Sequence, residues 1–175
     1  MTNSTRLSPI RRRTVQAGFT MMELLIGIAV LAILTTLAVP SFTQFIANNR
    51  LASEANEMVA SFQFARSEAL KRGVQVQVCS SGDGATCGGN WNQGWIAVAD
   101  PGPDEEVLRV WSPSDTAFQF TPASSTVGFQ PNGFSTAAAE QQIEMMLSGC
   151  TSDSARRILV EGTGRVASQR VDCPT

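Results

Sequence analysis

The sequence contains no histidine among its 175 residues. Histidine is the commonest general base near neutral pH and a frequent metal ligand, so its absence excludes the usual catalytic dyads and triads. The chain also lacks a G-x-S-x-G nucleophile motif and a phosphate-binding P-loop. These absences argue against an enzyme, and no cofactor is predicted.

Cysteine is scarce, with four residues at positions 79, 87, 150 and 173. An even number of cysteines in an exported domain predicts disulfides formed in an oxidising compartment. Three connectivities are possible; we favour Cys79 with Cys87, which flank a turn-rich loop, and Cys150 with Cys173. A zinc site is the alternative, but the spacing of Cys79 and Cys87 does not fit the usual short ligand pair. We therefore predict no metal.

Charge is nearly absent from one long segment. From position 24 to 39 every residue is apolar or small except Thr35 and Thr36, while Glu23 stands at its start and four arginines precede it, at 6, 11, 12 and 13. A charge at the centre of a membrane helix costs about 2.5–3.5 kcal/mol, and less near an end. Glu23 therefore needs a partner. The arginine cluster predicts a cytoplasmic N-terminus with the rest of the chain outside.

Two simpler interpretations of this segment are a secretory signal peptide and a plain membrane anchor. A signal peptide needs small residues at a cleavage site after the apolar core. Here the core runs into residues 36–40, Thr-Leu-Ala-Val-Pro, which is a poor site because proline adjoins the cut. A signal peptide would also leave Glu23 inside its apolar core without a purpose.

The motif Gly18-Phe19-Thr20-x-x-Glu23-Leu24 resembles the class III signal of type IV pilins and type II secretion pseudopilins. The rest of the chain is similar to the FimT/FimU minor pilins and their pseudopilin relative GspH. This similarity rests on FARSEA, WNQGW, FQPNGF and GRV at residues 64–69, 91–95, 129–134 and 164–166, and on a cysteine near the C-terminus.

The resemblance implies a definite chemistry at the N-terminus. A prepilin peptidase would cleave between Gly18 and Phe19 on the cytoplasmic side, and the new amine of Phe19 would be methylated. Glu23 would then pair with the Phe19 amine of a neighbouring subunit during assembly. Two buried charges are tolerated when paired, whereas leaving one unpaired costs on the order of 3–5 kcal/mol. Glu23 would thereby fix the register between subunits.

The resemblance also implies the function, the partners and the location. The expected function is a minor pilin that primes or caps a type IV pilus, with roles in twitching motility and DNA uptake. The alternatives are a DNA-binding tip receptor for natural transformation and a GspH-like minor pseudopilin of type II secretion. The expected partners are other minor pilins, the major pilin, the prepilin peptidase and the inner-membrane assembly platform. The chain would cross the inner membrane once, with a periplasmic β-domain, before joining a filament at the cell surface.

Four regions are predicted along the chain. Residues 1–18 form a cleaved leader, 19–46 the transmembrane and assembly half of a helix, 47–72 its amphipathic half, and 73–175 a β-rich globular domain. The amphipathic half shows an apolar stripe at steps of four and three, made of Leu51, Ala55, Met58, Phe62, Ala65 and Ala69. Pro40 is expected to kink or loosen the helix, and Gly73 to end it.

After Gly73 the pattern changes to a period of two, which is typical of half-buried strands. Strands are predicted at 74–78, 94–99, 107–111, 126–129, 143–147, 157–160 and 165–171. Six to eight strands joined by turns, without a βαβ rhythm, favour an antiparallel sheet. The predicted class is α+β and pilin-like: one long N-terminal helix, with an apolar transmembrane half, packed on a C-terminal antiparallel β-domain.

Two further groups of residues have both a functional and a structural interpretation. The acidic turn of Asp100, Asp104, Glu105 and Glu106 offers oxygen ligands for calcium, but acidic residues in a Pro-Gly turn are usually solvated. Trp91 and Trp95 suit an exposed recognition surface, but packing against the core is the simpler expectation.

Four arginines near the C-terminus are candidates for DNA binding: Arg156, Arg157, Arg165 and Arg170. A basic patch on adjacent strands would grip phosphates without reading the base sequence. Some FimT-type pilins similar to this chain bind DNA through a Gly-Arg-x-Arg motif, but here residues 164–167 read Gly-Arg-Val-Ala and lack the second arginine. The chain carries a net charge of −2, and the acidic excess grows when the leader is removed. DNA binding is therefore a local alternative, and exposed strand residues or contacts with other pilins are the simpler interpretation.

Overall fold

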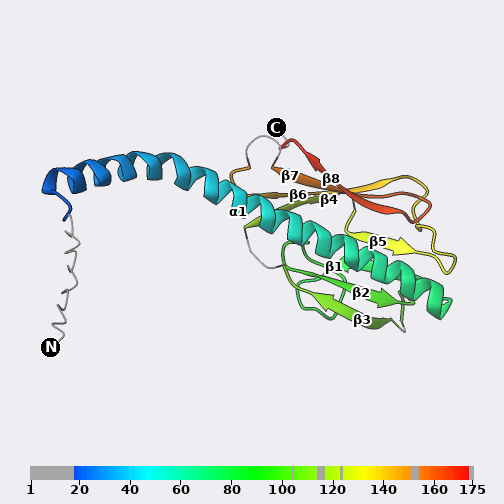
Figure 1. Ribbon diagram of the computed structural model, residues 1–175. Coiled ribbons are helices and arrows are strands. Elements are labelled where there is room, and N and C mark those ends of the chain that lie inside the picture. The colour runs from blue at the N-terminus through cyan, green and yellow to red at the C-terminus, as the bar shows by residue number, and fades with distance from the viewer. Residues whose placement is uncertain (1–17, 104, 114–116, 123, 151–153, 174–175) are drawn as a thin grey trace, which may run out of the picture. The chain divides into compact units, whose positions relative to one another are not determined.

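The computed structural model describes residues 18–103, 105–113, 117–122, 124–150 and 154–173 (Figure 1). The chain divides into two compact units, Met1–Phe42 and Thr43–Thr175, which are described separately. One helix, α1 (Met21–Arg72), begins in the first unit and continues into the second. The predicted leader, residues 1–18, lies outside the described residues except for Gly18.

The first unit consists of the N-terminal part of α1. Every side chain whose exposure is described there is exposed, and the helix continues across Pro40 without a break. An 18-residue window of α1 has a mean hydropathy of 2.4, so α1 is long and apolar enough to cross a membrane. Among the described residues of this unit, none covers the exposed apolar surface.

In the second unit, α1 presents the predicted stripe to the core. Leu51, Ala55, Met58, Phe62, Ala65 and Ala69 are all buried. The helix ends at Gly73, which has a positive φ of 68° and donates its N–H to the carbonyl of Ala69 at 3.0 Å. Glycine is favoured at this position because a left-handed residue closes the last turn without a steric penalty. The period of the apolar residues thus correctly predicted the buried face.

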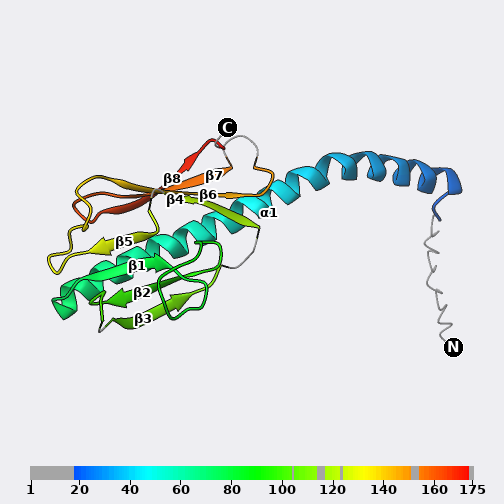
Figure 2. The same ribbon diagram turned by 180° about the vertical axis from the view of Figure 1, so that it is seen from behind.

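Eight strands follow α1 and form two antiparallel sheets. The first sheet has the order β3-β2-β1-β5 and the second the order β4-β6-β7-β8. Both sheets lie beside the C-terminal half of α1, as the views from the two sides show (Figures 1 and 2). The strands are β1 (Val76–Ser80), β2 (Trp95–Ala99), β3 (Glu106–Trp111), β4 (Phe118–Pro122), β5 (Thr126–Phe129), β6 (Gln141–Leu147), β7 (Ala155–Val160) and β8 (Val166–Val171).

The main core lies between α1 and the two sheets. Phe62 and Met58 of α1 share it with Trp95 of β2 and with Met145 and Ile158 of the second sheet. The α+β class and the antiparallel sheet are confirmed. The sequence analysis missed β4, which ends in Pro122. Proline is tolerated there because β4 lies at the edge of its sheet.

A smaller core lies apart from the main one. Its members, Cys79, Ile96 and Val98, are almost fully buried. Cys79 forms a disulfide with Cys87, and the other disulfide joins Cys150 to Cys173. This is the connectivity that the sequence favoured.

Arg66 ties the helix to two distant turns. Its Nε donates to the carbonyl of Gly133 at 2.9 Å, in the connection between β5 and β6. One of its terminal nitrogens donates to the carbonyl of Thr163 at 3.3 Å, in the turn between β7 and β8. A charged donor makes a stronger hydrogen bond than a neutral one. We call this arrangement the Arg66 clasp, and it holds α1 to both turns at once.

Gly164 is required where the two turns meet. Its φ is 78°, and a Cβ placed on it would collide with the carbonyl oxygen of Gly133, which the Arg66 clasp holds. Gly149 has a nearly equal φ of 80° but faces open space. Substituting each glycine in turn therefore separates the free-energy cost of a positive φ, which both sites share, from the cost of the collision, which occurs only at Gly164.

We expect Gly164→Ala to destabilise the second unit more than Gly149→Ala. A positive φ costs an alanine roughly 1–2 kcal/mol at either site, and the collision at Gly164 should add about 1–3 kcal/mol. Urea unfolding followed by tryptophan fluorescence measures the difference, because Trp91, Trp95 and Trp111 all lie in this unit. Equal losses of stability in the two variants would show that the turns move apart freely.

Candidate functional site

The start of α1 is capped by Thr20. Its Oγ1 accepts a hydrogen bond from the backbone N–H of Glu23 at 3.1 Å, and its carbonyl accepts one from Leu24 at 3.1 Å. A threonine side chain is a favoured cap because it satisfies a free N–H of the first turn. This cap places Glu23 in the first turn, where a negative charge interacts favourably with the helix dipole.

The carboxylate of Glu23 makes no ion pair or hydrogen bond with any described residue. The sequence carries no other charged residue until Arg50. Phe19, whose amine is the predicted cation of a neighbouring subunit, is exposed. Gly18, Phe19 and Glu23 thus lie close together along the chain at the exposed start of an apolar helix, and no described residue supplies a counter-ion to Glu23.

The four C-terminal arginines do not form one patch. Arg156 of β7 and Arg170 of β8 lie directly opposite each other. Arg157 lies on the other face of the sheet, because side chains alternate along a strand, and it pairs with Glu144 at 2.6 Å. Arg165 lies at the other end of the β7–β8 hairpin and pairs with Glu161 at 3.2 Å.

Arg156 and Arg170 remain as a pair without acidic partners among the described residues. Like charges directly opposite on adjacent strands destabilise a sheet. A bound anion would relieve this repulsion. The structure therefore reduces the predicted set of four arginines to one pair.

One carboxylate of the acidic turn, that of Glu106, forms an intramolecular ion pair at the surface. Glu106 accepts a hydrogen bond from Arg72 at 2.7 Å, while Asp104 lies outside the described residues. Lys71 and then Arg72 also donate to Glu68, and these bonds lower the pKa of Glu68. The part of the chain that the structure describes brings no three Asp, Glu or Cys side chains together in a metal-binding group.

Trp91 and Trp95 belong to the core. Both are buried, and their rings lie 6.5 Å apart. Trp91 also packs edge-on against Phe62 at 6.2 Å, and Trp95 against Phe120 at 6.4 Å. Packing, rather than exposure for recognition, is therefore the correct interpretation of this pair.

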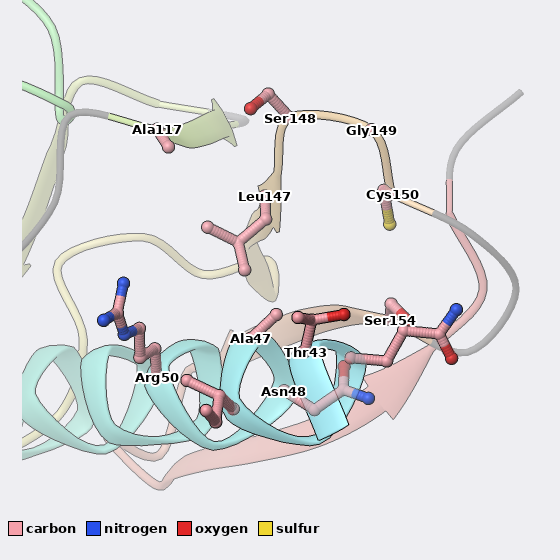
Figure 3. A pocket seen from close by; sticks show the side chains of 12 residues that line it. Thr43, Ala47, Asn48, Arg50, Ala117, Leu147, Ser148, Gly149, Cys150 and Ser154 are labelled. Carbon is pink, nitrogen blue, oxygen red and sulfur yellow. The ribbon is translucent and has the colours of Figure 1, made fainter. Parts of the chain in front are cut away.

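A hollow of about 390 Å³ lies between the start of the second unit's helix and the turn after β6 (Figure 3). Leu147 points toward the helix, and Ala47 and Arg50 line the helical side. Cys150, held by its disulfide to Cys173, lines the far end. Positions 151–153 lie outside the described residues, and we assign this hollow no ligand.

Arg66 is the residue whose role the sequence analysis missed. It lies in the FARSEA stretch at 64–69, next to the buried Ala65. A charged side chain beside a buried stripe was the available signal. Its partners are 67 and 97 residues away, and no local pattern identifies them.

Comparison with known proteins agrees with this architecture. The family described as type II transport protein GspH matches residues 54–164, and the prokaryotic N-terminal methylation motif matches residues 13–39. The second match includes Gly18, Phe19 and Glu23. A search of curated proteins found no significant match.

Solved structures of two proteins share the fold. The type IV minor pilin FimU of Pseudomonas aeruginosa aligns with a TM-score of 0.58 and 21% identity, over 71% of this chain and 92% of that one. A second crystal form of FimU aligns with a TM-score of 0.56. The minor pseudopilin EpsH of Vibrio cholerae aligns with a TM-score of 0.53 and 10% identity, over 69% of this chain and 97% of that one.

A helix with an N-terminal methylation motif, packed on two antiparallel sheets, defines the class of pilin-like filament subunits. The GspH profile covers more than half of the chain. The chain belongs to the GspH family, whose members are minor pilins and pseudopilins of type IV pili or type II secretion. These are structural proteins rather than enzymes.

Asp83 gives a testable pH dependence in the disulfide loop. Its carboxylate accepts hydrogen bonds from the N–H groups of Thr86 and Ala85 and from the hydroxyls of Thr86 and Ser81. These bonds hold the pKa of Asp83 far below its usual range. Because the folded pKa is depressed, the stabilisation is present above the unfolded value of about 3.9 and is lost as the pH falls below it.

We expect the wild type to lose more stability between pH 6 and pH 2.5 than Asp83→Asn, which cannot titrate at this position. Urea unfolding at several pH values gives the free energy of unfolding of each protein as a function of pH. The contributions of the other carboxylates are the same in both proteins and cancel in the comparison. Parallel slopes for the two proteins would contradict the role of the Asp83 carboxylate.

Proposed function

We propose that this chain is a minor pilin that primes or caps a type IV pilus. It enters the inner membrane by the apolar part of α1, with its N-terminus cytoplasmic and its β-domain periplasmic. A prepilin peptidase then cleaves between Gly18 and Phe19, and the Phe19 amine is methylated. The partners are other minor pilins, the major pilin and the inner-membrane assembly platform.

The observation that carries this proposal is the carboxylate of Glu23 at the start of an uncharged apolar helix. Within the described residues it has no cationic partner. Cleavage before Phe19 creates a positive amine four residues away along the chain, and methylation keeps it charged. A neighbouring subunit in the correct register brings that amine to Glu23, and the pair then tolerates burial among apolar helices.

The second role we consider is DNA binding by the pair of Arg156 and Arg170. Its support is geometric: Arg156 and Arg170 are directly opposite each other on β7 and β8, and neither forms an ion pair with a described acidic residue. A phosphate backbone would supply the missing negative charge. This role is compatible with a pilus subunit exposed at the cell surface.

A pseudopilin of a type II secretion filament is the alternative within the same family. The similarity to EpsH supports it only at the level of the fold, because identity is 10%. The genes adjoining this one discriminate the two, since pilus genes support the proposal and secretion genes support the alternative.

We expect Glu23→Ala to insert into the membrane normally but to enter filaments about tenfold less or worse. The reason is that an unpaired buried charge on the neighbouring amine costs about 3–5 kcal/mol. Immunoblots of sheared filaments and of membranes give the ratio. Glu57→Ala is the matched control, because Glu57 is an exposed glutamate of the same helix. Normal incorporation of Glu23→Ala would refute the pairing.

For DNA binding, we expect Arg170→Gln to weaken a mobility shift and to lower its salt slope by about 1, as the loss of one phosphate contact does. Arg165→Gln is the matched control, since Arg165 is already paired with Glu161. The shift should be measured with the full chain in detergent. No shift at low salt, or equal losses in both variants, would reject DNA binding by this pair.

A further inference from the structure

A hollow of about 570 Å³ lies beside the loop closed by the Cys79–Cys87 disulfide. One wall comes from Ser80, the last residue of β1, and from Asn90 and Asn92 in the connection to β2. The other comes from β4 and the start of the β5 region, with Gln119, Thr121 and Ser125. All of the described residues that line this hollow are uncharged. We call it the amide groove.

The rim of the amide groove carries free hydrogen-bonding groups. Asn92, Gln119 and Thr121 are exposed, and their side chains make no hydrogen bond with other described residues. The same holds for the side chains of Asn90 and Ser125. Each side-chain amide offers both donors and an acceptor, and each hydroxyl offers one donor and acceptor sites. The rim thus presents both hydrogen-bond donors and hydrogen-bond acceptors, all of them on neutral side chains.

The floor of the amide groove is aromatic. Phe120, which is half-buried, and the buried Trp91 both line it. Trp91 is fixed because its Nε1 donates to the carbonyl of Ser124 at 3.3 Å. Phe120 is fixed by its edge contact with Trp95 at 6.4 Å. Trp91 is only 2% exposed, so the partly exposed ring of Phe120 supplies the apolar face that a ligand can contact.

The wall near Asn90 is also held in place. Gln93 accepts the N–H of Asn90 on its side-chain oxygen at 2.9 Å and donates its own N–H to the Asn90 carbonyl at 2.9 Å. Ser80 donates its hydroxyl to the carbonyl of Gly89 at 3.1 Å, next to the Cys79–Cys87 disulfide. A wall ordered before binding lowers the entropic cost of capturing a ligand.

This combination fits a neutral sugar. A pyranose ring presents hydroxyl groups that both donate and accept, together with patches of C–H that pack against aromatic rings. The uncharged lining offers no ion pair to a phosphate or a carboxylate. We propose that the amide groove binds one or two residues of a neutral oligosaccharide. This binding is independent of the filament assembly proposed above.

The test is a titration of the full chain in a zwitterionic detergent, because sugar-based detergents would compete. The probes are maltotriose, lactose, mannotriose and chitotriose, followed by saturation-transfer NMR. We expect at least one probe to bind, with an affinity that is insensitive to salt. Asn92→Ala with Gln119→Ala should weaken it about tenfold, as the loss of two hydrogen bonds of roughly equal strength predicts.

Two controls make the result specific to the amide groove. Gln169→Ala removes an exposed glutamine on β8 and should leave the affinity unchanged. Phe120→Leu keeps apolar volume but removes the ring, and should weaken binding without unfolding the domain. Failure of all four sugars to bind at 20 mM (roughly the weakest affinity of interest) would overturn the proposal. Binding that survives the double substitution would also overturn it.

Discussion

One negative charge at the start of an apolar helix constrains the whole molecule. Glu23 is followed by no charged residue until Arg50, and every side chain described between positions 24 and 46 is exposed. Such a segment is stable only in lipid or among other apolar helices. In both surroundings the carboxylate needs a cation. In the assembly proposed above, a neighbouring chain supplies that cation, and this pairing links the membrane and filament states of the protein.

In the second unit, the C-terminal half of α1 packs against two separate sheets. The shared apolar core supplies most of the stabilisation, since it joins α1 to both sheets. The Arg66 clasp fixes the position of the helix more narrowly than apolar packing does, because its hydrogen bonds tie the β5–β6 and β7–β8 connections to one point on α1. The two disulfides then fix the loop after β1 and the C-terminus. The exposed surfaces of the domain, including the amide groove and the arginine pair, are held on this frame.

Local patterns predicted the elements that depend on local physics. The buried stripe of α1 follows from the helical period, and most of the strands follow from alternation with a period of two. The edge strand β4 was missed because a proline such as Pro122 usually indicates a turn rather than a strand. The role of Arg66 and the separation of the four arginines depend on register and on contacts between distant segments. Adjacent residues of a strand, such as Arg156 and Arg157, lie on opposite faces of the sheet. Arginines that are close in sequence therefore do not form one basic patch.

The central claim requires an amine on Phe19, because otherwise Glu23 has no partner of the right kind in a filament. Mass spectrometry of the N-terminal peptide, taken from protein in assembled filaments, tests this most directly. The account predicts a chain that begins with a methylated Phe19. Filament protein that retains residues 1–18, or that begins after the apolar segment, would contradict it.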